Sequence, residues 1–248
     1  MTSVDDELFM LLVRENNQVA VYSLDDYKLL RHLNVPRYEP RDDSDMTSCV
    51  RSKCLYMSDY VNNCIHRHEL ASSATIKWEV PGKPCGLSVT TSCNLLVTCQ
   101  RWGENKLSEL NAESGQCVRE IPLDMGWSIH SVQLATGHFA VCHGRGETNL
   151  HRVCVVGDDG KVARRYGDQC GSKVGQLYNP CHLAVDEASQ FIFVADSHND
   201  RVVLLTPTLV FVCDVIEGLS FPDRIHFHQA TRRLFVGEYS GRTTIIQL

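Results

Sequence analysis

Short apolar runs recur along this chain at a nearly constant spacing, and this spacing restricts the fold more than any other feature. The runs have the continuous apolar character of buried β-strands and are too short for helices. Equivalent positions in successive runs are separated by 46, 40, 44, 53 and 42 residues; they are Leu11, Met57, Val97, Val141, Val194 and Val236. A period of about 40–50 residues is typical of repeated β units. The sequence therefore predicts six such units.

The stretch 180–206 shows one unit most clearly. Three strand-like segments, at 182–186, 191–195 and 202–205, are separated by turn-forming polar clusters at 186–189 and 196–200. A fourth strand is expected at 208–215. Four antiparallel strands in about 40 residues match one blade of a β-propeller. The predicted fold class is therefore all-β, a six-bladed β-propeller, with residues 1–248 forming a single domain.

Two segments of this stretch resemble a known repeat. Pro-x-x-Leu-Ala-Val-Asp at 180–186, followed by Phe-Val-Ala-Asp-Ser-x-Asn-x-Arg-Val at 193–202, closely resembles the NHL repeat, the blade unit of six-bladed propellers. The resemblance is specific over 180–205 and fades with distance from it. In this repeat the Asp often caps the turn to the third strand, so Asp196 is expected to cap, with Arg201 or Arg242 able to pair nearby. Capping is favoured over calcium binding for the acids Asp59, Asp196 and Glu238.

The two ends of the chain complicate ring closure. The first blade is expected to lack an inner strand before residues 8–13, and the last blade ends after three strands at residue 248. Three explanations stay open: the ring closes with trimmed blades, the terminal strands share one sheet, or the chain is a fragment of a longer protein.

Composition and charge exclude several function classes. The net charge is −6, which argues against broad binding of nucleic-acid phosphates. No basic signal peptide and no run of about 18 apolar residues is present, so we expect a cytoplasmic protein with no membrane contact. None of the twelve cysteines forms a Cys-x-x-Cys pair, which predicts reduced, mostly buried thiols rather than a zinc motif.

In a propeller, equivalent residues of the inner strands meet around a central channel. One predicted ring carries Gly86, His130, His182 and Arg224; a second ring, at the ends of the second strands, carries Val13, Asp59, Cys99, His143, Asp196 and Glu238. The segment His-Ser-x-x-Leu at 130–134 is similar to an element of the peptide-amidating lyase, whose family pattern implies three channel histidines around zinc. The third ligand is missing here, because its position holds Gly86 or Arg224. A metal-dependent lyase or hydrolase with a site in the channel is therefore kept as an alternative, and no metal, cofactor or catalytic residue is assigned.

Binding of single-stranded RNA is a second alternative, because some NHL propellers bind it through a basic, aromatic-bearing face. The pairs Arg164-Arg165 and Arg232-Arg233 would have to meet Trp102 or Tyr239 on one surface. The remaining basic residues, Arg51, Lys53 and Arg101, are scattered.

The function favoured by the sequence is recognition. A rigid disc with many loops suits the binding of a protein or peptide without catalysis, and we expect a monomeric propeller with a scaffold role. The predicted contact residues lie at the channel mouth and on the loop face, and aromatic residues supply contact area. They are His130, His143, His182, His198, Arg224, Glu238, Trp102, Trp127 and Tyr239.

Overall fold

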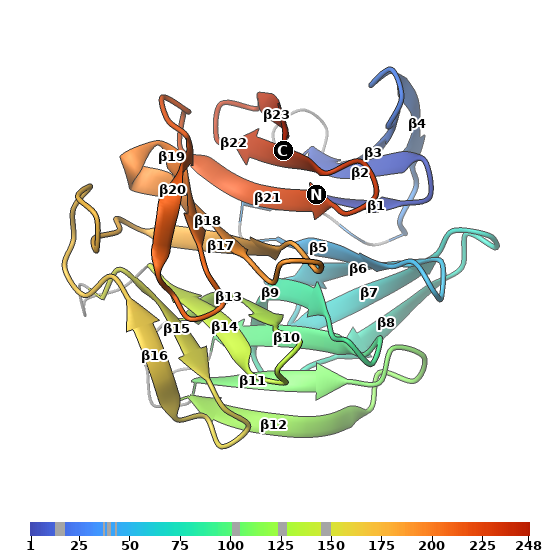
Figure 1. Cartoon of the computed structure of the whole chain (residues 1–248). Helices are drawn as coiled ribbons and strands as arrows, with labels where there is room; N and C mark the ends of the chain where they lie inside the picture. The colour runs from blue at the N-terminus through green and yellow to red at the C-terminus, as the bar shows by residue number, and fades with distance from the viewer. Residues whose placement is uncertain are drawn as a thin grey trace.

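The computed structural model describes residues 1–12, 18–36, 38, 41–42, 44–100, 105–123, 128–144 and 150–248. Within these ranges the chain forms twenty-three strands in six antiparallel sheets, and in each sheet the strands follow one another in chain order. The sheets stand side by side around one axis (Figure 1). The prediction of a six-bladed all-β propeller is confirmed.

The first three blades contain four strands each. Blade one holds β1 (Thr2–Val4), β2 (Glu7–Leu12), β3 (Gln18–Ser23) and β4 (Leu29–Leu33). Blade two holds β5 (Met46–Cys49), β6 (Cys54–Asp59), β7 (Cys64–Glu69) and β8 (Thr75–Glu79). Blade three holds β9 (Lys83–Val89), β10 (Leu95–Gln100), β11 (Asn105–Leu110) and β12 (Cys117–Leu123).

The last three blades continue the pattern until the final sheet, which has three strands. Blade four holds β13 (Ser128–Gln133), β14 (Phe139–His143), β15 (Arg152–Val156) and β16 (Val162–Tyr166). Blade five holds β17 (Pro180–Val185), β18 (Ile192–Asp196), the short 3₁₀ turn η1 (Ser197–Asn199), β19 (Arg201–Leu205) and β20 (Phe211–Ile216). Blade six holds β21 (Pro222–His228), β22 (Arg233–Glu238) and β23 (Thr243–Gln247).

The expectation that blade one lacks its inner strand is wrong. Strand β1 pairs with β2 through Thr2 with Phe9 and Val4 with Glu7. This strand is only three residues long and mostly polar, so the apolar pattern gives no sign of it. The missing outer strand of blade six is confirmed, and the terminal strands lie in separate sheets rather than in a shared one.

Burial follows position within the blade. The second strands β6, β14 and β18 are buried along their whole length because both faces of each sheet pack against neighbouring blades, whereas β2 is partly exposed. The outer strands β4 and β16 are mostly exposed. The apolar core is therefore distributed between blades; the cluster between blades six and one contains Met1, Leu8, Leu24 and Phe235, with Met10 and Tyr22 packed against it.

The strand register divides the connections between two faces of the disc. Pro180 pairs with Asp196 and Pro222 with Glu238, so the inner strands begin at the same end as the turns between second and third strands. We call this end the entry face. It carries the described segments 60–63, 197–200, 217–221 and 239–242. The opposite exit face carries 50–53, 187–190, 206–210 and 229–232.

Two further observations concern the sequence predictions. All twelve cysteines lie in the described ranges and none of them is in a disulfide bond. Eight are buried, although Cys213 is exposed where an apolar strand environment was expected. The described residues contain no helix long and apolar enough to cross a membrane.

Candidate functional site

Four polar side chains from four blades meet near the entry end of the inner strands. Each of them directly precedes an inner-strand residue that pairs with the middle of the second strand of its blade. These inner-strand residues and their second-strand partners are Met46 with Met57, Ser131 with Val141, Leu183 with Val194, and Ile225 with Val236. The four residues are therefore equivalent, and we call them the hub cluster: Asp45, His130, His182 and Arg224.

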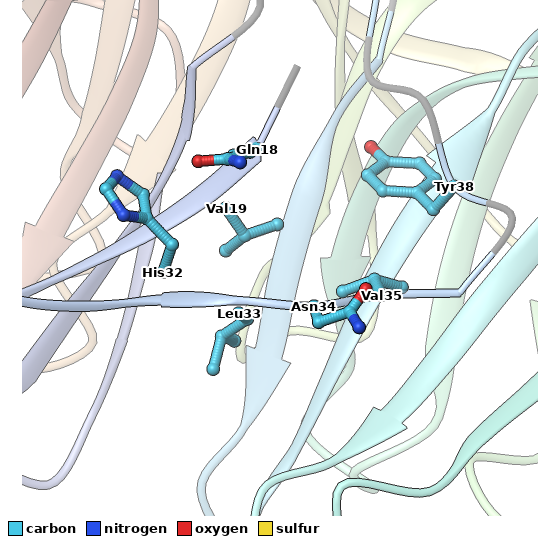
Figure 2. Close-up of a pocket in the computed structure, with 7 residues that line it drawn as sticks. All are labelled: Gln18, Val19, His32, Leu33, Asn34, Val35 and Tyr38. Atoms are coloured by element: carbon cyan, nitrogen blue, oxygen red, sulfur yellow. The ribbon is translucent and has the colours of Figure 1, made fainter. Parts of the chain in front are cut away.

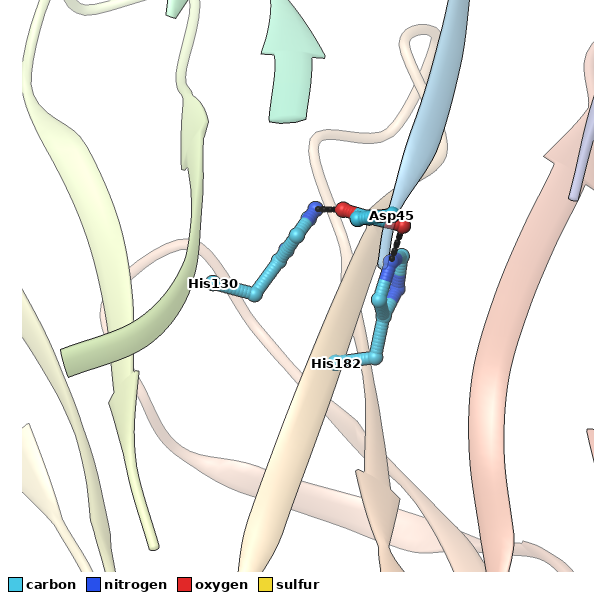
Figure 3. Close-up of side chains that lie close together, drawn as sticks. All are labelled: Asp45, His130 and His182. Atoms are coloured by element: carbon cyan, nitrogen blue, oxygen red, sulfur yellow. Dashed lines mark hydrogen bonds and ion pairs between the residues drawn. The ribbon is translucent and has the colours of Figure 1, made fainter. Parts of the chain in front are cut away.

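Asp45 is the centre of the hub cluster (Figure 3). Its Oδ1 atom lies 3.4 Å from Nε2 of His182 and 3.4 Å from Nε of Arg224. Its Oδ2 atom accepts a hydrogen bond from the backbone N–H of Leu87 at 2.8 Å and lies 3.6 Å from Nε2 of His130. One carboxylate thus contacts groups from blades three, four, five and six.

The backbone fixes the tautomer of His130. The N–H of Leu183 points to Nδ1 at 3.3 Å, so Nδ1 is the acceptor and carries no proton. The proton is therefore on Nε2, which donates to the carbonyl oxygen of Leu87 at 3.1 Å. The ring also stacks on His182 with 3.7 Å between centroids. Both nitrogens of His130 are occupied by the backbone.

Burial sets the charges of the cluster. Desolvation lowers the pKa of His130 to about 3, with a further contribution from His182. Burial also lowers the pKa of His182, although Asp45 acts in the opposite direction. For Asp45, burial alone would raise the pKa, but His182, Arg224 and His130 together hold it well below its usual value. At neutral pH the hub cluster is therefore an ionised carboxylate, a guanidinium and two neutral imidazoles.

The ligand atoms of Asp45, His130 and His182 lie within 4.8 Å of one another, which makes a metal centre worth testing. The donor chemistry does not fit one. His130 would have to give up its bond to the Leu87 carbonyl, and Arg224 already places a positive charge beside the carboxylate. The geometry instead fits an internal ion pair that joins blades.

Gly86, the blade-three member of the predicted ring, leaves room for this arrangement. A Cβ atom at this position would overlap the carbonyl oxygen of Ile129 and lie 2.8 Å from the Cα of His130. Strands β9 and β13 therefore approach each other closely where the imidazole of His130 crosses toward Asp45.

The structure places the other predicted contact residues in two environments. His143 and Glu238 are buried, as are His130 and His182, so these four lie beneath the surface rather than on it. His198 and Tyr239 are exposed on the entry face. Trp102 and Trp127 lie outside the described residues. Whether any of them contacts a partner stays a prediction.

The expected pairing of the acids at the second-strand ends with Arg201 and Arg242 is confirmed, whereas the side chain of Asp196 makes no capping hydrogen bond to the turn that follows it. In blade five, Oδ2 of Asp196 accepts hydrogen bonds from Asn199 at 2.7 Å and from Nε of Arg201 at 2.8 Å. In blade six, Arg242 donates to both oxygens of Glu238, at 2.6 and 2.9 Å. These pairs fix the turns of the entry face.

Aromatic side chains form a row across the entry face of blades five and six. The ring of Tyr178 meets that of His198 edge-on at 4.7 Å, and His198 meets Phe221 edge-on at 5.6 Å. Tyr239 continues the row, because its backbone N–H donates to the carbonyl oxygen of Phe221 at 3.1 Å. We call these four residues the aromatic row. The exposed fractions of Tyr178, Phe221 and Tyr239 are 39%, 46% and 54%.

Backbone and side-chain hydrogen bonds hold the aromatic row in place. The N–H of Tyr178 donates to Oδ1 of Asp196 at 2.6 Å, and the N–H of His198 donates to the carbonyl oxygen of Tyr178 at 3.0 Å. The N–H of Phe221 donates to Oδ1 of Asp200 at 3.0 Å. The sequence analysis named His198 and Tyr239 but missed Tyr178 and Phe221. Tyr178 stands two residues before the inner-strand Pro180, and Phe221 directly before the inner-strand Pro222.

The pair Arg232-Arg233 does not gather with these aromatics. Arg232 lies in the exit-face turn of blade six and pairs with Asp186 at 3.1 Å. Arg233 follows it, and its guanidinium lies over the ring of Tyr27. Tyr239 is at the other end of the same sheet, so the grouping of Arg232-Arg233 with Tyr239 that RNA binding would use does not form.

A pocket of about 220 Å³ lies beside the outer strands of blade one (Figure 2). Tyr38 stands on one side of it and His32 on the other (Figure 2). The remaining lining residues are Gln18, Val19, Leu33, Asn34 and Val35. This pocket could not be predicted from the sequence, because its walls come from two strands, β3 and β4, and from the connection to blade two.

Comparisons with known proteins support the fold and leave the function open. No protein-family model matches the chain, and no curated protein matches its sequence. Similar solved structures include hydrazine synthase of Kuenenia stuttgartiensis, with 14% identity, a TM-score of 0.72, and coverage of 100% of this chain and 94% of that chain. Virginiamycin B lyase of Staphylococcus aureus has 10% identity, a TM-score of 0.65, and coverage of 99% and 83%.

A third similar structure is the β-propeller domain of Cps50 (Swd1) from Myceliophteria thermophila. It has 11% identity, a TM-score of 0.66, and coverage of 98% of this chain and 94% of that chain. At such identities the likeness shows the propeller fold alone.

Proposed function

We propose that this chain is a non-catalytic recognition propeller of NHL type that binds a protein or peptide through its entry face. The observation that carries the proposal is the aromatic row, Tyr178, His198, Phe221 and Tyr239. Exposed aromatic side chains held in fixed positions supply contact area at low entropic cost, which is what binding hot spots require.

The hub cluster supports a recognition role indirectly. Its charges are paired with one another and its histidines are neutral, so it provides a rigid centre for the loops around it. The NHL assignment is supported by the cap of blade five, where Asp196, Asn199 and Arg201 of the motif contact one another.

A selection of displayed random peptides on the immobilised protein tests the proposal. Selected peptides should bind the wild type, and each truncation Phe221→Ala and Tyr239→Ala should weaken binding by about 30-fold, the equivalent of about 2 kcal/mol for a hot spot. The matched control is Val50→Ser with Val210→Ser, two exposed residues on the exit face, which should leave binding unchanged.

Two results would contradict the proposal. One is the recovery of peptides that bind both aromatic truncations as tightly as the wild type, and the other is a loss of binding in the exit-face control. Titration with single-stranded RNA under the same conditions addresses the alternative, since binding with a steep salt dependence would favour a nucleic-acid partner.

A further inference from the structure

Three side chains with metal-binding atoms converge in blade two, away from the hub cluster and the aromatic row. Asp59 ends β6, Cys64 begins β7, and His66 lies two residues further on the same face of that strand. Sγ of Cys64 lies 3.6 Å from Nε2 of His66, and the same Nε2 lies 3.4 Å from Oδ2 of Asp59. All three residues are buried, and their ligand atoms lie within 4.8 Å of one another.

The convergence on a single nitrogen separates this cluster from a catalytic triad. In a nucleophile–base–acid triad the thiol and the carboxylate contact different nitrogens of the histidine. Here both contact Nε2, as ligand atoms around a common centre do. A tetrahedral zinc ion with ordinary bond lengths would hold its sulfur, nitrogen and oxygen ligand atoms about 3.3–3.6 Å apart. The observed 3.6 and 3.4 Å match that spacing.

The other blades of the same chain show what is missing at this position. Cys64 pairs with Asp59 in the register in which Arg201 pairs with Asp196 in blade five. Arg201 neutralises Asp196 at 2.8 Å, and Arg242 does the same for Glu238 in blade six. Blade two keeps the acid and its amide cap, since Asn62 donates to Asp59 as Asn199 donates to Asp196. Only the guanidinium has been replaced, by a thiol and an imidazole.

The replacement leaves a buried carboxylate without a cation in the contacts that the described residues make. The side-chain contacts of this carboxylate are the amide of Asn62, at 2.8 Å, and Nε2 of His66, at 3.4 Å. A buried carboxylate is stable when a positive charge compensates it.

We propose that Asp59, Cys64 and His66 bind one Zn²⁺ ion, which takes the place held by an arginine in blades five and six. The ion displaces the thiol proton of Cys64 to solvent and leaves a fourth position for water. The turn directly above the cluster, residues 60–63, is largely exposed on the entry face, and the ring of Tyr38 packs on His66 with 5.2 Å between centroids. The mixed oxygen, nitrogen and sulfur donor set suits zinc rather than calcium or magnesium.

Metal titration tests the site in a background where the exposed thiols are removed by Cys117→Ser, Cys170→Ser and Cys213→Ser. Chelator-treated protein is titrated with Zn²⁺ against a chromophoric competitor, and with Co²⁺ to record the spectrum. We expect one equivalent of Zn²⁺ and a Co²⁺ spectrum with a thiolate charge-transfer band and tetrahedral d–d bands.

The decisive variant is Cys64→Arg, which reproduces the arginine of blade five. It should lower zinc affinity at least about 100-fold while keeping the thermal midpoint of the metal-free protein, because a guanidinium again compensates Asp59. Cys64→Ser and His66→Gln should weaken zinc binding to a similar degree, and they serve if Cys64→Arg does not fold. Cys93→Ser, in a turn of blade three, is the control and should bind zinc as the parent does.

Three outcomes would overturn the proposal. The first is that the parent protein binds no more zinc than its Cys64→Ser variant. The second is undiminished zinc affinity in the folded Cys64→Arg variant, and the third is a Co²⁺ spectrum without a thiolate band. None of these results bears on the aromatic row, so the recognition function and the zinc site stand or fall separately.

Discussion

Asp45 is the residue on which the contacts between blades at the centre of the ring most depend. It accepts a hydrogen bond from blade three and lies against side chains from blades four, five and six. A buried charge pair is costly to break because the remaining charge keeps its desolvation penalty. Its contribution is therefore best seen when one partner is removed.

Asp45→Asn should destabilise the protein by about 3 kcal/mol. The change leaves Arg224 without its interior counter-ion, although Asp223 still contacts the guanidinium at 2.9 Å. Urea unfolding followed by tryptophan fluorescence measures the loss. Asp26→Asn, which removes an exposed ion pair with Lys28, should leave the midpoint where it is. Equal stability of Asp45→Asn and wild type would show that the hub cluster does not hold the blades.

The buried histidines make stability fall on acidification. Burial lowers the pKa of His130 and that of His226 to about 3, from 6.5 in the unfolded chain. Between pH 6.5 and about 3 the unfolded state therefore binds protons that the folded state does not, so stability is present above pH 6.5 and declines below it. Each such histidine contributes a slope of about 1.4 kcal/mol per pH unit.

Unfolding measured in steps from pH 7.5 to 5 checks this slope before carboxylates begin to titrate. Replacing His130 with Gln should reduce the slope by about one proton. A stability that is flat across this range would contradict the buried, neutral state of these rings.

At this scale the sequence predicts part of the hub cluster. His130, His182 and Arg224 are predicted as one ring because they align on the segment Pro180-Cys181-His182. Asp45 stands 12 residues before Met57, as His182 stands 12 residues before Val194, but the sequence prediction does not include it. The contacts themselves could not be predicted, since they join residues between 42 and 179 positions apart, such as Asp45 with Leu87 and Asp45 with Arg224.

At the scale of strands and turns, an acidic side chain recurs at the end of the second strand while the groups that contact it differ between blades. An acid at the end of the second strand contacts a side chain or backbone group of the following turn in blades two, five and six, at Asn62, Asn199 and Arg242. Blade five follows the motif and was predicted in detail. Strand β1 was missed because three mostly polar residues carry no periodic signal, although pairing with β2 is enough to order them.

The close approach of β9 and β13 gives a prediction for Gly86. Gly86→Ala should destabilise the protein by about 1–3 kcal/mol, because the added Cβ meets backbone atoms of Ile129 and His130 that cannot move independently. Thermal unfolding measures the change. Gly157→Ala is the matched control: its new Cβ would meet side-chain atoms alone, the carboxylate of Asp159 at 3.1 Å and the ring of His138 at 3.8 Å. A Gly86→Ala variant as stable as this control would show that the inner strands can separate.

At the scale of the whole molecule, the ring closes between blades one and six through contacts made by side chains. Phe235 is fully buried there, and its ring meets Tyr27 edge-on at 6.2 Å. Arg233 donates to the carbonyl oxygen of Leu24 at 3.4 Å across the same boundary. Blades one and six lie side by side in Figure 1, and none of the described strands is shared between them.

Phe235→Ala should therefore open the ring at this boundary. We expect a loss of about 3–5 kcal/mol and, in hydrogen exchange monitored by mass spectrometry, a loss of protection that begins in blades one and six. Phe139→Ala, an equally buried change between blades three and four, should begin its loss there instead. Identical exchange patterns for the two variants would mean that the ring unfolds as one unit.

Because every described sheet is made from one unbroken length of chain, none of them has to wait for a distant segment before it forms. During synthesis each blade can assemble once its own residues have left the ribosome, and the contacts it makes are local, which favours rapid folding. The meeting of Asp45 with Arg224 and the docking of Phe235 against the first blade need residues of the sixth blade. The ring therefore closes only after all six blades have been synthesised.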